Sequence, residues 1–204
     1  ILGVKPNVLA AILPDLREAF DKKKPLVVSI AAGKTLGYLE EFFAEGTPIV
    51  RVMPNINAKI GASTTGLCVN SFVTQAQREQ VKEVFSTIGT VQEIDEAQFS
   101  IFSVIGGASV AFAYLYMDAL AHAAVKAGMP KKQALEITAE TVLGSAKMLL
   151  ESQEAPWPLI DQVCSPGGTT IEGVTTLQAG GFESVLVKAF DAVLAKDRAI
   201  GEKK

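Results

Sequence analysis

The sequence contains almost none of the side chains from which metal centres and nucleophile sites are built. It has a single histidine, His122, and only two cysteines, Cys68 and Cys164, which lie far apart. Their spacing does not fit a zinc site, and the sequence holds no serine elbow and no Walker loop. These absences disfavour hydrolases, kinases and metalloenzymes. They leave chemistry in which a bound cofactor carries out the difficult step.

A charge imbalance and long apolar runs are also lacking. Lysine and arginine number 19 against 22 aspartates and glutamates, and no basic patch stands out. This composition disfavours a nucleic-acid partner. No apolar run approaches roughly 20 residues, so we expect no membrane span. Because the opening residues do not form a signal peptide, we expect a cytoplasmic protein with both cysteines reduced and buried.

The sequence also lacks the glycine-rich turn that opens a dinucleotide-binding domain. No G-x-G-x-x-G stands between a strand and a helix, and Gly106 and Gly107 open a predicted helix without that pattern. The sequence has no initiator methionine and begins on an apolar segment, residues 1–4, that reads as a short buried strand. We therefore expect a longer protein, in which at least one βαβ unit of about 30 residues precedes Ile1.

The first half alternates strand and helix patterns. Apolar runs at residues 26–30, 49–53, 66–70 and 89–94 predict strands, and helical patterns separate them. This alternation predicts a mostly parallel, Rossmann-like sheet with helices on both faces. We assign residues 1–95 to a partial dinucleotide-binding domain. Ligands of such sheets bind beyond the carboxyl ends of the strands.

The second half, residues 96–204, is predicted to be a helical domain. A helix over residues 106–126 carries small apolar side chains on nearly every side, so we expect it to be buried all round. So much apolar helix surface predicts an intimate homodimer. Within this helix, His122 is expected to be a core histidine rather than a base, and Asp118 a partly exposed carboxylate rather than a catalytic one.

A glycine motif over residues 163–171 is the most distinctive stretch of the chain. We expect Ser165 to cap a helix and Pro166 to take its first position. Gly167 and Gly168 would let backbone N–H groups approach an anion, such as a carboxylate, at the positive end of the helix. The spacing alone fits a well-capped helix start equally well.

At residues 164–171 the sequence resembles the pyrroline-5-carboxylate reductases. Further blocks agree in order and spacing, at residues 4–6, 29–33, 51–55, 141–144 and 180–182. The resemblance implies hydride transfer from NADPH or NADH to the C=N bond of 1-pyrroline-5-carboxylate, which gives L-proline in the last step of proline biosynthesis. It also implies a nucleotide-binding domain, a helical dimerisation domain, and interlocked dimers that often assemble into rings. The substrate pocket of such dimers lies near the domain junction and uses helical domains of both subunits.

The resemblance assigns roles to individual residues and implies no metal. Thr170 matches the family position that holds the imine nitrogen, which makes it the predicted catalytic residue. The predicted substrate-binding residues are Ser165, Gly167, Gly168 and Thr169, and the predicted cofactor-binding residues are Val4, Lys5, Pro6, Ala32 and Asn55. The sequence departs from the family pattern at Val110, where proline is usual, and at residues 56–57, which replace the commoner Thr-Pro.

Two other functions stay open. A β-hydroxyacid dehydrogenase also joins a nucleotide domain to a helical one, but it needs a lysine on a helix as its acid and base. The predicted helix over residues 106–126 offers only Lys126, at its very end. A non-catalytic dimerisation module, which keeps the helical half of the reductase, is the second alternative.

Overall fold

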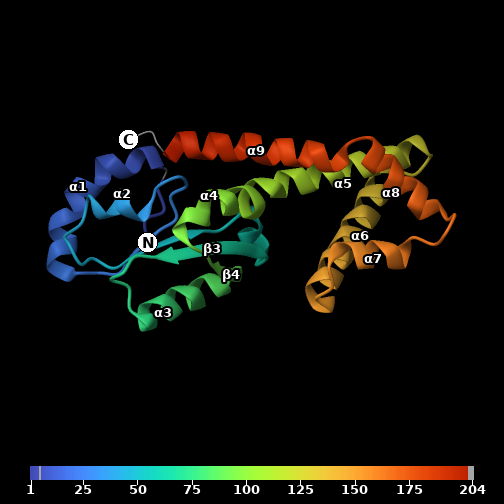
Figure 1. The fold of residues 1–204 in the computed structure, drawn as a ribbon. Helices are drawn as coiled ribbons and strands as arrows, with labels where there is room; N and C mark the ends of the chain where they lie inside the picture. The colour runs from blue at the N-terminus through green and yellow to red at the C-terminus, as the bar shows by residue number, and fades with distance from the viewer. Residues whose placement is uncertain (5, 202–204) are drawn as a thin grey trace. The chain divides into compact units, whose positions relative to one another are not determined.

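The computed structural model describes residues 1–4 and 6–201 and divides the chain into two compact units (Figure 1). Unit 1 holds residues 1–109 together with the C-terminal stretch from residue 190, and unit 2 holds residues 110–189. The predicted α/β half followed by a helical half is confirmed. The predicted domain boundary between residues 95 and 96 stays a prediction.

Unit 1 is built on a four-stranded sheet in the order β1-β2-β3-β4. The strands are β1 (Val27–Ser29), β2 (Ile49–Met53), β3 (Ser63–Val69) and β4 (Gly89–Glu93). β1 pairs with β2 and β3 with β4 in parallel, whereas β2 and β3 are antiparallel. The link between β2 and β3 holds only the short helix η1 (Ile56–Ile60). A parallel crossover needs a dozen or more residues, so this link forces the chain to reverse.

Helices cover both faces of the sheet. Figure 1 shows α1 (Pro6–Lys23) and α2 (Leu36–Glu40) on one side and α3 (Gln75–Ser86) on the other. Alternate residues of the strands enter two separate cores, as the period of a strand requires. The predicted strand at residues 1–4 is reduced to one parallel bridge between Leu2 and Ser29.

One continuous helical stretch follows β4 and corrects the predicted start of a helix at Gly106. It comprises η2 (Glu96–Gln98), α4 (Phe99–Phe102), the π-helical turn η3 (Ser103–Ala108) and α5 (Ser109–Lys126). The helix does not open at Gly106, because the helical stretch already runs from Glu96 and Gly106 lies inside its π-helical turn. Residues Glu96–Lys126 are long and apolar enough to span a membrane by length and composition, and their most apolar window has a mean hydropathy of 1.6. A helix that packs against a protein partner passes the same test.

Unit 2 is formed by α5, α6 (Lys131–Ser152), α7 (Pro156–Val163), α8 (Thr169–Ala179) and the first part of α9 (Phe182–Gly201). Only Ala121, Ala134 and Thr138 are buried within it. The expectation that the helix at residues 106–126 is buried all round is therefore wrong for the single chain, in which nothing covers its outer faces. α7 begins at Pro156, because proline suits the first helical position.

Candidate functional site

The glycine motif forms a tight turn ahead of α8. The Gly168 N–H donates to the Ser165 carbonyl at 3.0 Å, and Gly167 has a φ of 68°. Proline at the second position and a left-handed glycine at the third are the signature of a type II turn. The predictions that Ser165 caps the helix and that Pro166 begins it are therefore wrong, since both residues are used by the turn.

The N-terminus of α8 keeps free donors. Gly168 is its N-cap, so no side chain caps the helix, and the N–H groups of the first turn have no partner within the helix. A Cβ on Gly168 would clash with the Ser165 side chain, so the turn and the N-cap fit only without it. Thr169 and Thr170 are exposed. Backbone donors at the positive end of a helix, flanked by hydroxyls, suit a carboxylate.

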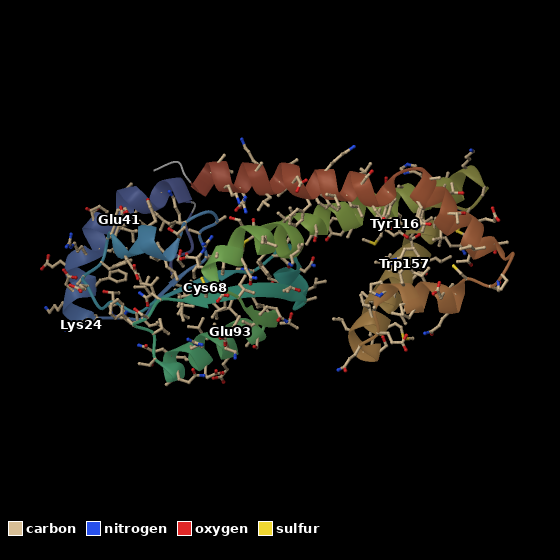
Figure 2. The ribbon with its side chains drawn as sticks, viewed as in Figure 1. Lys24, Glu41, Cys68, Glu93, Tyr116 and Trp157 are labelled. Atoms are coloured by element: carbon tan, nitrogen blue, oxygen red, sulfur yellow. The ribbon has the colours of Figure 1, made fainter. Side chains whose placement is uncertain are left out.

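Thr170 also lines the largest cavity described in unit 2. The cavity has a volume of about 860 Å³ and is formed by α5, α6, α7 and α8. Its walls are mostly apolar and include Tyr116, labelled in Figure 2, Met148 and Leu149. Cys164 lines it too and is half-buried rather than buried as predicted. Of the five predicted substrate and catalytic residues, Thr170 alone belongs to this lining.

The predicted cofactor residues gather at one edge of the sheet in unit 1. Val4 follows the residues that pair in parallel with β1, Ala32 follows β1, and Asn55 follows β2. Carboxyl ends of neighbouring parallel segments meet at the same edge. Ala32 is exposed, and Asn55 is half-buried. Lys5 lies outside the described residues, and Pro6 begins α1.

Asp118, His122 and Lys131 form a polar cluster that joins α5 to α6. The Asp118 carboxylate pairs with Lys131 and lies 2.9 Å from His122 Nδ1. The hydrogen bond from Lys131 is the main cause that lowers the pKa of Asp118. The His122 side chain is 66% exposed, so the expectation of a core histidine is wrong, whereas the partly exposed Asp118 is confirmed. Pattern reasoning missed Lys131, because the corner between the helices brings it to Asp118.

The Cys68 thiol and the possible metal ligands of the described residues differ from what nucleophilic and metal sites require. Cys68 lies inside it, as Figure 2 shows, and burial, followed by the Glu96 charge, raises its pKa to about 12. The thiol is therefore protonated at neutral pH and a poor nucleophile. Across residues 1–4 and 6–201, no three histidine, cysteine or acidic side chains are grouped to hold a metal ion.

Comparison with known proteins identifies the family. A family profile described as pyrroline-5-carboxylate reductase dimerisation matches residues 96–200. The pyrroline-5-carboxylate reductase of Methanosarcina acetivorans is 37% identical over 203 residues, which cover all of this chain and 75% of that protein. The chain belongs to the pyrroline-5-carboxylate reductase family.

Solved structures of pyrroline-5-carboxylate reductases agree over nearly the whole chain. The enzyme of Streptococcus pyogenes matches with a TM-score of 0.88 and 38% identity, over 97% of this chain and 74% of that one. The enzyme of Plasmodium falciparum, solved with NADP bound, matches with a TM-score of 0.90 and 30% identity, over 98% of this chain and 80% of that one. The Rossmann-like part and the helical part therefore both belong to the family fold.

Proposed function

We propose that the protein reduces 1-pyrroline-5-carboxylate to L-proline with NAD(P)H. The observation that carries the proposal is the α8 N-terminus, where free backbone donors lie beside Thr170 at the cavity. The substrate has one carboxylate and one imine nitrogen, so it needs an anion site next to a hydroxyl. The 37% identity to named reductases over the full chain supports the same reaction.

The residues of the α8 N-terminus bind and orient the substrate in this proposal. The N–H groups of Thr169, Thr170 and Ile171 hold the carboxylate, and the turn of Gly167 and Gly168 keeps side chains out of its way. The Thr170 hydroxyl holds the imine nitrogen, which is protonated before reduction, so no strong protein acid is required. The bound dinucleotide supplies the hydride. Orientation of the imine carbon then provides most of the rate.

The edge of the sheet that bears Val4, Ala32 and Asn55 is the proposed dinucleotide site. Ala32 leaves room for a flat ligand at this edge, because it presents only a methyl group and is exposed. Gly33 beside it adopts a left-handed φ of 72° that other residues avoid, which lets the chain turn sharply after β1. The Plasmodium relative was solved with NADP bound, which supports NADPH or NADH as the dinucleotide of this site.

A homodimer is the proposed minimum assembly. Unit 2 exposes many large apolar side chains, among them Leu115, Leu143 and Leu150, each at least 70% exposed. Patches of this kind mark protein interfaces, and the matched family profile is one of dimerisation. A ring of dimers, a cytoplasmic location, and the absence of nucleic-acid and membrane partners stay predictions.

The test uses the full-length natural protein that carries these residues. Oxidation of NADPH or NADH is followed by absorbance with 1-pyrroline-5-carboxylate, and L-proline is quantified in the same samples. We expect one proline for each dinucleotide oxidised. A protein that binds no dinucleotide and forms no proline would instead support a non-catalytic dimerisation module, and oxidation of 3-hydroxy acids would support a β-hydroxyacid dehydrogenase.

A further inference from the structure

Two buried hydroxyls in β3 have no place in the proposed chemistry. Ser63 and Thr65 are 1% and 0% exposed, and their hydroxyl oxygens are 3.2 Å apart. The Ser63 Oγ also accepts the backbone N–H of Asn55 at 3.0 Å. Buried hydroxyls destabilise a fold unless they are hydrogen-bonded, and these two bond to each other and to the Asn55 backbone. The bond to Asn55 connects the pair to the segment that follows β2.

Asn55 joins two segments that are far apart in the sequence. Its Oδ1 accepts the N–H of Asn57 at 3.0 Å, which caps η1. Its Nδ2 donates to the Gly106 carbonyl at 2.8 Å, across 51 residues of sequence. One side-chain N–H and one lone pair of Oδ1 are therefore used in hydrogen bonds within the protein and not for a ligand.

The carbonyl that Asn55 holds belongs to the π-helical turn η3. A π-turn inside an α-helix displaces carbonyls from their regular partners and is often found at functional sites. Gly107 lies so close to the end of β2 that an added Cβ would come within 2.8 Å of the Met53 methyl group. At the start of the turn, the Ser103 hydroxyl donates to Asp197 of α9 at 2.8 Å. Side chains from two directions thus hold η3 beside the edge proposed for the dinucleotide.

We infer that Asn55 is a positioning residue, which fixes η3 beside the dinucleotide edge through Gly106, and that Ser63 and Thr65 position Asn55 in turn. The inference rests on the proposed function and goes beyond it, because Asn55 then acts on catalysis through the Gly106 backbone rather than by binding the cofactor. Small displacements of positioned groups lower the rate of a reaction more than they weaken binding. Loss of the Asn55 donor therefore lowers kcat.

The central experiment compares Asn55→Asp with the wild type in the full-length protein. Aspartate keeps the acceptor for Asn57 but loses the donor to Gly106 and turns a carboxylate toward its carbonyl. We expect kcat to fall by about tenfold or more, with the Kd for NADP⁺ and the KM for 1-pyrroline-5-carboxylate changed by less than about threefold. We also expect faster hydrogen exchange of backbone amides in residues 103–109.

Ser63→Ala supplies a second variant that keeps the Asn55 side chain, and Thr64→Ala on the same strand is its control. We expect Ser63→Ala to show the Asn55→Asp pattern in weaker form and Thr64→Ala to behave as wild type. An Asn55→Asp protein with unchanged exchange and a Kd for NADP⁺ raised about tenfold overturns the inference, because Asn55 would then be a direct ligand. The exchange measurement stands even if the wild type makes no proline, so failure of the proposed function is seen separately.

Discussion

Units 1 and 2 use their apolar side chains in opposite ways. In unit 1 the sheet buries Leu39, Ile49, Val50 and Phe99 almost completely against its own helices. In unit 2 the comparable side chains of α5 and α6, such as Leu115 and Leu143, remain largely exposed. Unit 1 therefore has a core that can hold a binding edge rigid, whereas unit 2 needs a partner surface before its apolar area is removed from water.

This difference explains why one helix resembles a membrane span. Glu96–Lys126 contains a long apolar window, yet only 22% of that window is buried within the chain. In the part that belongs to unit 1, Phe99, Phe102 and Val104 are buried. The part in unit 2 is exposed, and the matched dimerisation profile covers it. A protein partner accounts for the composition as well as a lipid environment does.

The largest expected effect is a loss of stability that depends on protein concentration in unit 2 but not in unit 1. Leu39→Ala removes a fully buried side chain of unit 1, and we expect it to lower the free energy of unfolding by about 2–5 kcal/mol at any protein concentration. Leu143→Ala in unit 2 should cost less, and its cost should shrink as the protein is diluted. Urea unfolding at several protein concentrations measures both. Equal, concentration-independent losses would contradict the comparison.

A charge placed in the cavity of unit 2 should dissociate the dimer. Leu149 lines both described cavities of this unit, so Leu149→Lys would bury an ammonium group at the proposed interface. We expect the dimer Kd to rise by about 100-fold or more. Gln133→Lys adds the same charge at an exposed position of α6 and serves as the control. Sedimentation velocity distinguishes monomer from dimer, and a dimer that survives Leu149→Lys places the interface elsewhere.

Removal of the Thr170 hydroxyl should reduce catalysis without affecting assembly. Hydrogen bonds to charged groups contribute about 1.5–3 kcal/mol, so we expect Thr170→Ala to lower kcat/KM roughly 10- to 150-fold. Thr170→Ser keeps the hydroxyl and should retain most of the activity. Thr169→Ala, one residue away, tests whether the effect belongs to Thr170. Steady-state kinetics measure kcat/KM for each variant. Equal values for Thr170→Ala and the wild type would contradict the role proposed for the Thr170 hydroxyl.

The smallest expected effect concerns the cluster of Asp118, His122 and Lys131. A lowered carboxyl pKa contributes stability above the pKa of the unfolded state, and that contribution is lost as the pH falls through the folded-state pKa. Lys131→Ala should therefore raise the pKa of Asp118 toward its ordinary value. The difference in Tm between this variant and the wild type should be small at neutral pH and vanish in acid. A difference that is independent of pH would show that Lys131 acts by packing alone.

Local patterns predicted the fold better than they predicted contacts. The buried run at residues 49–53 became β2, and Thr74 forms a full capping box with Gln77 at the start of α3. Both signals are contained in neighbouring residues. The antiparallel pairing of β2 and β3 has no signal in the alternation of strands and helices, and it follows from a link that is shorter than a parallel crossover needs. The hydrogen bond from Asn55 to Gly106 could not be predicted, since no local pattern records a contact across 51 residues.

In the candidate site, too, local features could be predicted from the sequence and contacts between distant residues could not. The composition of the glycine motif correctly indicated the start of a helix, because glycine and proline restrict the chain locally. It assigned Ser165 and Pro166 to the helix and not to the turn, because the left-handed φ of Gly167 is set by the fold. The cavity beside Thr170 depends on four helices and has no local signal. The substrate was predicted from the resemblance of the glycine motif to the family, because the physical pattern indicated only an anion site.

A crystal structure of the full-length protein with L-proline bound tests the central claim most directly. The account predicts the proline carboxylate within about 2.7–3.2 Å of backbone nitrogens at the α8 N-terminus, and the ring nitrogen within hydrogen-bond distance of the Thr170 hydroxyl. Proline bound away from residues 165–171, with the α8 N-terminus in contact with water or protein only, would contradict it.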